Sequence, residues 1–331
     1  MNCSKCNEKA IYSNCGMLLC KNHFLSYFEA KVIRTINRYG LIKKNDIVCV
    51  ATSGGKDSLA VLFMTMVYCR RNKIDFFALA IDEGISGYRD ATLTDLRKFC
   101  GDNGINLHVV QIKETMGVTL DEMKESAIKE FGKKPCTVCG ILRRSFLNKN
   151  ARKLGATKLV TGHNLDDESQ SFMMNTLLGN MRHNAAMGPI TGLSENSMFV
   201  PRVKPLYFVS EKETRLFALL KGFDVNFAEC PNIGMSFRAV VRDALNEIEA
   251  KLPGAKNSIV NSFLEILPEL KEKYKGKQFM ICERCGEPCA GKICNACTLE
   301  EQLGVKRQQI SLFSCGHGDA DEAIKLPSKI F

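Results

Sequence analysis

The chain has 331 residues, of which 45% are hydrophobic and 25% charged, so it is long enough for a sizeable core and has the composition of a soluble globular protein. No apolar run reaches membrane-spanning length, and the first residues carry cysteines and charges where a secretory signal needs an apolar stretch. We therefore expect a cytoplasmic protein with no membrane association. The net charge of +10 favours a polyanionic partner, although a solvated basic surface would also account for it.

Sixteen cysteines in a cytosolic chain favour metal binding over disulfides, because that compartment keeps thiols reduced. Towards each end of the chain, two short-spaced pairs of ligands have the spacing that grips one tetrahedral zinc ion. The two predicted zinc sites consist of Cys3, Cys6, Cys20 and His23, and of Cys282, Cys285, Cys294 and Cys297. Cys15 and Cys289 are surplus to these two sets.

Residues 47–58 carry the strongest local signal. Residues 47–51 are apolar or small, as in a strand covered on both faces. The glycines that follow let backbone N–H groups close around an anion, and a helix that starts near residue 57 adds the positive end of its dipole. A lysine and two hydroxyls beside them supply a charge and donors that a plain connection does not need. We predict a phosphate-binding loop that contacts its ligand through Ala51, Ser53, Gly54, Gly55, Lys56, Asp57 and Ser58.

This loop is not a Walker A motif, because Val50 and Asp57 stand where that motif requires its first glycine and its Ser or Thr. The sequence S-G-G-K-D-S instead resembles the PP-loop of the N-type ATP pyrophosphatases. Those enzymes hold the pyrophosphate of ATP and cleave between the α and β phosphates. The motif is silent on the second substrate.

Further strands are expected at residues 76–81, 107–112 and 158–161, with helices at 59–71, 89–100 and 120–131. This alternation predicts an α/β fold with a doubly wound, mostly parallel sheet. Such sheets bind their ligands at the carboxyl ends of the strands. We therefore expect adenine near the backbone of Ile81, and further cofactor contacts from Gly162 and His163 at the end of another strand.

An acidic run, Asp166, Asp167 and Glu168, follows that second strand end. Three acids can simply complement the dipole of the helix that they open, or they can serve catalysis or magnesium binding, which their place at the sheet edge favours. Beyond them we expect an edge segment at 199–206, a strand that ends at 227–231, helices at 236–252 and 258–274, and an irregular tail from residue 308.

Four motifs together resemble the TtcA/TtuA family of tRNA 2-thiolation enzymes: S-G-G-K-D-S, P-C-T-V-C at 135–139, G-H-N-L-D-D at 162–167, and C-P-N-I-G-M-S-F-R from Cys230. The zinc sites narrow the resemblance to the branch with TtuA and the archaeal and eukaryotic wobble-uridine thiolases. It covers the chain from Cys3 to about Cys297. We divide the chain accordingly into a zinc finger (1–30), a PP-loop catalytic domain (31–275), a zinc ribbon (276–305) and a tail (306–331).

The resemblance implies a reaction with ATP and Mg²⁺ in which the 2-oxygen of a tRNA uridine is adenylated, pyrophosphate leaves and sulfur displaces AMP. Lys56 and its loop would hold the β and γ phosphates. The family pattern implicates in catalysis a basic residue four positions after the second cysteine of the P-C-T-V-C motif, and an aspartate of the G-H-N-L-D-D motif. These are Arg143 and Asp167. Because the family member compared has lysine at the first position, we assign Arg143 to phosphate contact.

Sulfur would arrive at Cys136, Cys139 and Cys230. A C-x-x-C pair alone indicates zinc or a redox pair. With Cys230 the set gives three thiolates where structural zinc wants four ligands, whereas three thiolates suit a 4Fe-4S cluster with one iron free of protein ligand. The strongest competing hypothesis is a persulfide on Cys136 or Cys230, with a disulfide closing the cycle.

Two competing functions remain open. One is a PP-loop enzyme that adenylates a carboxylate or another tRNA base, which would not need the three cysteines. The second is an RNA-binding scaffold whose phosphate-binding loop has lost its function. The intact residues of this loop argue against that alternative. Family members act on the anticodon wobble position or on the T loop, and take sulfur from free sulfide or from a ubiquitin-like carrier. We expect a homodimer that binds tRNA through a basic surface, which includes Arg34, Arg38, Lys43, Lys44, Lys133 and Lys134.

Overall fold

A six-stranded sheet forms the centre of the computed structural model, which describes residues 1–14, 16–132, 134–193, 198–224, 230, 237–275, 280–305 and 313–314. The strand order is β10-β5-β4-β3-β6-β7. Neighbouring strands from β5 to β7 run parallel, and β10 pairs antiparallel with β5. The strands are β3 (Ile47–Thr52), β4 (Asp75–Asp82), β5 (Leu107–Gln111), β6 (Lys158–Val160), β7 (Arg202–Val203) and β10 (Phe313–Ser314).

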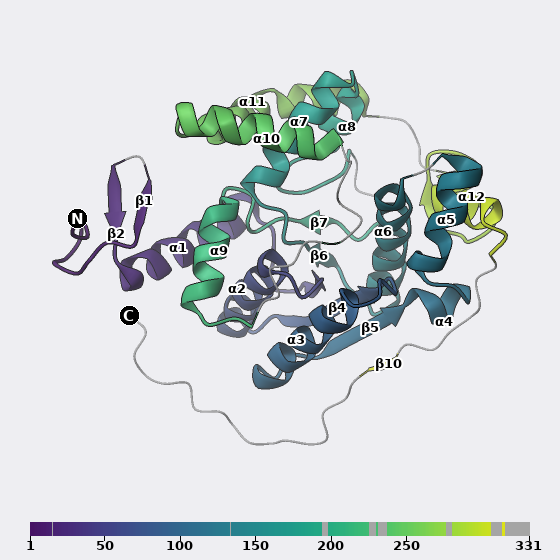
Figure 1. The fold of residues 1–331 in the computed structure, drawn as a ribbon, viewed down its shortest axis with the longest axis horizontal. Coiled ribbons are helices and arrows are strands. Elements are labelled where there is room, and N and C mark those ends of the chain that lie inside the picture. The colour runs from purple at the N-terminus through teal and green to yellow at the C-terminus, as the bar shows by residue number, and fades with distance from the viewer. Residues whose placement is uncertain are drawn as a thin grey trace.

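Helices cover both faces of this sheet (Figure 1). They are α1 (Lys21–Tyr39), α2 (Lys56–Asn72), α3 (Arg89–Asp102), α4 (Ile112–Met116), α5 (Leu120–Phe131), α6 (Pro135–Lys153), α7 (Leu165–Leu177), α8 (Met181–Ala185), α9 (Glu211–Leu220), α10 (Phe237–Lys251), α11 (Ala255–Tyr274) and α12 (Asn295–Gln302). Strand β3 has buried side chains on both faces of the sheet, so a layer of helices must cover each face. Val48 and Val50 belong to one core with α1, α2, α3 and α9, and Cys49 to another with α4, α5 and α6. The doubly wound α/β fold predicted from the sequence is confirmed.

The two ligand groups predicted to bind zinc lie in small modules at opposite sides of the sheet domain (Figure 1). The N-terminal module contains the antiparallel strands β1 (Tyr12–Asn14) and β2 (Met17–Leu19), and Cys20 is the N-cap of α1. The C-terminal module pairs β8 (Met280–Ile281) with β9 (Pro288–Cys289) and packs its helix α12 against α6. Each module therefore rests on a helix of the sheet domain.

Helix α6 begins at Pro135, so the C-x-x-C pair lies in its first turn. Proline suits this first helical position because its missing N–H has no partner there in any case. In the tail, expected to be irregular, residues 313–314 form β10. Residue 112, expected to end a strand, opens α4 instead.

The strand expected to end at 227–231 lies outside the described residues, except for Cys230. The edge segment expected at 199–206 contains β7, which is an edge of the sheet within the described part of the chain. No helix among the described residues has the length and apolar character that a membrane span requires.

Two glycines bring the phosphate-binding loop into close backbone contact with its neighbours. Gly54 has φ +81°, and a Cβ built on it would lie 2.2 Å from the carbonyl oxygen of Thr92 in α3. A Cβ on Gly162, after β6, would lie 3.0 Å from the carbonyl oxygen of Asp57. Any side chain at either position would push the loop away from α3 or from the end of β6.

We predict that Gly54→Ala destabilises the fold by more than Gly155→Ala. Both glycines have a similar positive φ, +81° and +78°, so both alanines carry the left-handed backbone cost of about 1–2 kcal/mol. Only Gly54 has a backbone neighbour within reach, since nothing lies within 4 Å of a Cβ built on Gly155. Urea unfolding of both variants measures the difference. Equal losses of unfolding free energy would contradict the close-packing argument.

Candidate active site

The phosphate-binding loop joins β3 to the N-terminus of α2. Gly55 is the N-cap of α2 and has no side chain, so the first backbone N–H groups of the helix remain available to an anion. The turn is fixed by Ser58, whose hydroxyl donates to the Gly55 carbonyl at 2.8 Å and accepts the Ser53 N–H at 3.2 Å. Residues 53–58 thus form the turn at a helix N-terminus that the sequence predicts as an anion cradle, and anion binding by this turn stays a prediction.

Lys56 lies between two carboxylates at the edge of this cradle. Its Nζ donates to Glu211 Oε1 at 2.8 Å and to Asp57 Oδ2 at 3.0 Å. Burial alone would lower the pKa of Lys56, but the charges of Asp57 and Glu211 raise it above its ordinary value. Lys56 is therefore a firmly protonated cation. Glu211 is half-exposed, and its carboxylate would compete with a bound anion for this lysine.

Glu211 is held in place by the first turn of α9. Its backbone N–H donates to Asp166 Oδ2 at 2.7 Å, and Ser210 and Glu213 form a capping box at the same helix end. Glu213 also accepts from the Tyr12 hydroxyl at 2.8 Å and from Lys31 Nζ at 2.9 Å. The N-terminal zinc module therefore contacts the same helix turn that presents Glu211 to the phosphate-binding loop.

The turn after β6 forms the second wall of the site. Nδ1 of His163 lies 2.9 Å from the Thr161 hydroxyl. The His163 ring is partly exposed, and partial desolvation together with the nearby cations Lys204, Arg238 and Arg202 lowers its pKa below the ordinary value. His163 is thus a neutral ring at physiological pH, suited to hydrogen bonding and contact rather than to carrying charge.

The three acids predicted to serve catalysis or magnesium binding have separate roles in the structure. Asp166 is buried and paired with Lys256, and Glu168 is buried and accepts from Lys204 at 2.7 Å. Asp167 forms the capping box of α7 with the N-cap residue Asn164, so the hypothesis of a helix-capping acid also applies to it. Its Oδ1 accepts from Arg238 at 3.0 Å.

Asp57 and Asp167 face the same space beside the cradle. Burial raises the pKa of each carboxyl, and the charge of Asp167 raises that of Asp57 further. Asn164 joins the two sides, since its Nδ2 donates to Asp57 Oδ1 at 3.2 Å. Two crowded carboxylates next to a phosphate site are an oxygen-rich donor set that fits Mg²⁺.

The cysteine site lies at the start of α6. Cys136 is exposed, Cys139 is buried and Cys230 is intermediate. Burial raises the pKa of Cys136 and of Cys139, and the charge of Cys230 contributes to both shifts, so the three thiols are near one another. Among the described residues, only the two terminal groups bring three or more metal-ligand atoms within 4.8 Å of each other. Cys136, Cys139 and Cys230 offer three thiolates, the donor set that suits a 4Fe-4S cluster with one iron free of protein ligand.

Arg143 connects the cysteine site to the sheet edge. Its Nη2 donates to Cys139 Sγ at 3.2 Å, and its Nε lies 3.3 Å from Glu83 Oε1. The charges of Cys139 and Glu83 raise the pKa of Arg143, against the lowering effect of burial. The contacts with Cys139 and Glu83 place the guanidinium beside the Cys139 sulfur. The phosphate contact predicted for Arg143 stays a prediction.

Arg89 and Glu83 are functional-site residues that the sequence patterns did not predict. Arg89 is buried, pairs with Glu83 and donates to the carbonyls of Ser53 and Ile81, both at 2.6 Å. It thereby ties the start of the phosphate-binding loop to the end of β4, where adenine was expected. Glu83 lies directly after β4, but no local pattern connects it to an arginine six positions later.

Both terminal groups have the geometry of tetrahedral zinc ligands. Zinc–sulfur bonds of about 2.3 Å place two sulfurs about 3.8 Å apart in a tetrahedron. The Sγ atoms of Cys6 and Cys20 lie 3.7 Å apart, as do those of Cys285 and Cys294. Nδ1 of His23 lies 3.3–3.5 Å from all three sulfurs of its group. The ligand sets predicted from spacing are thus assembled in the fold, and Cys15 lies outside the described residues.

Comparison with known proteins agrees with this site. The family model described as the PP-loop domain matches residues 25–247. The tRNA-5-methyluridine(54) 2-sulfurtransferase of Pyrococcus horikoshii is 36% identical over 90% of this chain and 93% of its own. The tRNA 2-thiolation protein NcsA of Haloferax volcanii is 33% identical over 92% of this chain and 99% of its own.

A solved structure is also similar to this chain. The U34-tRNA thiolase NcsA from Methanococcus maripaludis, solved with its [4Fe-4S] cluster, superposes with a TM-score of 0.76 at 31% identity, covering 92% of this chain and 96% of its own. The chain is therefore a member of the PP-loop class of ATP-using proteins. Within that class it belongs to the TtcA/TtuA family of tRNA 2-thiolation enzymes, as its motifs predicted.

We predict that Cys282→Ala releases one of two bound zinc ions, because a thiolate is lost from a module too small to fold on apolar burial alone. Elemental analysis of the purified protein measures the zinc content. Cys289→Ala is the matched control, since Cys289 lies in the same module but outside its ligand set. Loss of zinc from the control, or full retention in Cys282→Ala, would contradict the assignment.

We also predict that Glu211→Gln tightens the binding of metal-free pyrophosphate roughly two- to fivefold, because it removes a carboxylate that competes for Lys56. Isothermal titration calorimetry in EDTA measures the affinity. Glu247→Gln, which changes an exposed acid paired with Lys251 on α10, controls for net charge. Weaker binding by Glu211→Gln would show that Glu211 supports the ligand rather than competing with it.

Proposed function

We propose that this protein is an ATP-dependent tRNA-uridine 2-sulfurtransferase. The observation that carries the proposal is the arrangement of Lys56 and Cys139 at one edge of the sheet, joined by the Arg89–Glu83–Arg143 contacts. A phosphate site and a thiol site so linked suit a reaction that activates an oxygen with ATP and then replaces it with sulfur. The names of the relatives give the substrate: tRNA, modified at a uridine 2-position.

The first step is adenylation. The loop and Lys56 would hold the β and γ phosphates, and Asp57 and Asp167 would hold Mg²⁺, which would neutralise their crowded carboxylates and charge on the leaving pyrophosphate. The 2-oxygen of the uridine attacks the α phosphorus, and pyrophosphate leaves. Gly162 and His163 border the nucleotide, and the end of β4 at Ile81 borders the adenine. Arg89 donates to the Ile81 carbonyl and fixes this strand end, where the second lone pair of the carbonyl remains open to the adenine.

The second step replaces oxygen with sulfur. Cys136, Cys139 and Cys230 would hold a 4Fe-4S cluster, which would supply an iron site for sulfide when bound. Arg143, on the Cys139 sulfur, stabilises thiolate charge and orients this ligand. Sulfur attacks carbon 2 of the activated uridine, and AMP leaves with the former 2-oxygen. The persulfide mechanism uses the same cysteines, and the cluster in the solved relative favours the cluster mechanism.

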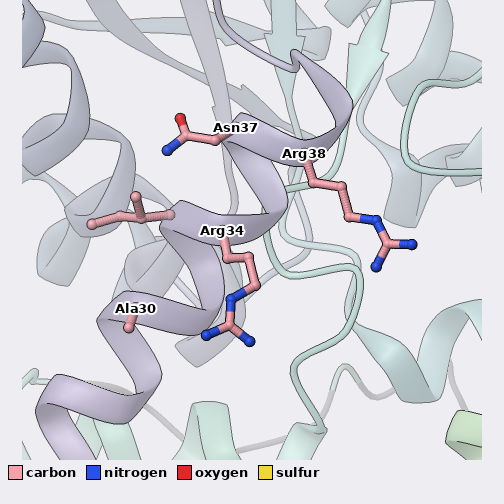
Figure 2. A pocket seen from close by; sticks show the side chains of 5 residues that line it. Ala30, Arg34, Asn37 and Arg38 are labelled. Carbon is pink, nitrogen blue, oxygen red and sulfur yellow. The ribbon is translucent and has the colours of Figure 1, made fainter.

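The tRNA lies on a basic surface that begins at α1. Arg34 and Arg38 project from one side of this helix, four positions apart, beside a hollow of about 720 Å³ (Figure 2). Lys43 and Lys44 follow α1 directly and are exposed, and Lys134 caps α6, whereas Lys133 lies outside the described residues. Phosphate contacts of this kind give affinity without sequence preference. The target base must turn out of the folded RNA to reach the sheet edge.

We further propose that the protein works in the cytoplasm, as the name "Cytoplasmic tRNA 2-thiolation protein 1" of a Chlamydomonas reinhardtii relative suggests. A homodimer, and sulfur from sulfide or a ubiquitin-like carrier, remain predictions, as do the domain boundaries at residues 30, 275 and 305.

We predict that Lys56→Ala lowers the thiolation rate by at least roughly a hundredfold and tRNA affinity by less than threefold, because Lys56 touches phosphates and not RNA. Nucleoside mass spectrometry of tRNA after incubation with ATP and sulfide measures the rate, and filter binding measures affinity. Lys98→Ala, which removes an exposed lysine on α3, is the control. A fully active Lys56→Ala variant would overturn the proposed role of the loop.

Cys230→Ala should abolish both the iron–sulfur absorption of anaerobically purified protein and thiolation, because a cluster with two protein thiolates is poorly held. Cys100→Ala, at a buried cysteine on α3 remote from the site, should leave both intact. Cluster-free protein that still thiolates tRNA would favour the persulfide mechanism instead.

A further inference from the structure

A second pocket of about 350 Å³ lies between α6, the segment before β7 and the C-terminal zinc module. One wall carries Arg144 of α6 and Arg202 of β7, and the opposite wall is the loop after β9, at Ala290 and Gly291. This loop has little side chain, so a ligand can approach its backbone. The pocket is separate from the phosphate-binding loop and is not used by the reaction steps above.

A hydrogen bond connects the two arginines of the pocket. Arg202 Nη2 donates to the backbone carbonyl of Arg144 at 3.4 Å. The guanidinium of Arg144 extends back over Gly140, where a Cβ would lie 3.2 Å from its Nη1. Gly140 follows Cys139 directly, so this side chain lies along the first turns of α6, next to the cysteine site. A neighbouring residue on the same helix, Arg143, contacts the Cys139 sulfur.

Neither guanidinium has an acidic partner among the described residues. The one buried acid that lines the pocket, Glu287, is already bound by Arg152 at 2.5 Å and by Asn148 at 3.0 Å. Burial lowers the pKa of Arg202 to about 10, and the charge of Arg144 adds to the effect. Burial and the charge of Arg143 lower that of Arg144. Arg144 is exposed and Arg202 is part-buried, so both guanidinium groups are open to a ligand, and an anion bound between them would offset their mutual repulsion.

We propose that Arg144 and Arg202 bind a phosphodiester group of the RNA substrate, close to the nucleotide that enters the active site. Planar guanidinium groups present paired N–H donors that match phosphate oxygens. An RNA strand that delivers one base to the cysteine site carries further phosphates at short intervals, and the pocket lies beside that site. The proposal rests on the proposed function, and it assigns the C-terminal zinc module a role as one wall of the RNA site.

Features of the chain favour RNA over two other anionic ligands, ATP and a thiocarboxylate carrier. ATP already has a cradle for its phosphates at residues 53–58, with Lys56 and the helix end of α2. A carrier peptide with a C-terminal thiocarboxylate would bring one anionic group, which a single cation could bind. Two arginines together with a net charge of +10 fit a polyanion better.

The test compares Arg144→Gln and Arg202→Gln with Arg97→Gln, which changes an exposed arginine on α3. We expect each pocket variant to weaken tRNA binding roughly five- to thirtyfold at moderate salt. The slope of log K against log salt concentration should fall by about 0.7–0.9 for each variant, the share of one phosphate contact. ATP affinity and zinc content should remain those of the wild type. Arg202→Lys keeps the charge and should keep most of the salt slope.

Each contrary outcome has a definite meaning. Wild-type protein that neither binds nor thiolates tRNA would overturn the proposed function, and this inference with it. Wild-type thiolation with unchanged tRNA affinity and salt slope in both pocket variants would overturn the inference alone. Weaker ATP binding with normal tRNA binding would assign the pocket to ATP. Normal tRNA binding with a defect only when a thiocarboxylate carrier replaces free sulfide would assign it to the carrier. Both of the last two results also overturn the inference.

Discussion

The active edge of this protein depends on two points at which backbone touches backbone. Gly54 lets the phosphate-binding loop lie against the Thr92 carbonyl of α3, and Gly162 lets the turn after β6 lie against Asp57. Without these contacts, α2 and α7 could not bring Asp57 and Asp167 to the same space. The geometry that a phosphoryl-transfer reaction needs is thus fixed by the absence of two side chains, before any charged residue contributes.

Buried ion pairs then stabilise the packing of the elements that carry the active site. Lys256 with Asp166 and Arg89 with Glu83 are buried pairs whose members come from different elements. Removing one partner of such a pair leaves a buried charge without compensation, which is strongly destabilising. These pairs use acids and bases as structural supports under the site. The more exposed charges, such as Lys56 and Asp167, remain for the ligand. The division explains why acids adjacent in sequence serve different purposes.

Much of this architecture could be predicted from the sequence, because local signals specify it. The strand–glycine–helix pattern at 47–58 located the phosphate-binding loop, and ligand spacing located both zinc groups. The start of α6 at Pro135 was not predicted, because a C-x-x-C pair also occurs in loops. The roles of Arg89 and Glu211 depend on contacts between distant elements. Glu211 is 155 positions from the lysine that it binds, so no local pattern could connect the two.

The central claim is that ATP activates the uridine oxygen before sulfur replaces it. The most direct test uses tRNA with ¹⁸O at the 2-position of the target uridine, incubated anaerobically with ATP, sulfide and cluster-loaded protein. If the 2-oxygen attacks the α phosphorus, each 2-thiouridine formed releases one AMP that carries the ¹⁸O label, together with unlabelled pyrophosphate. Thiolation that yields unlabelled AMP, or ADP and phosphate, would contradict the account.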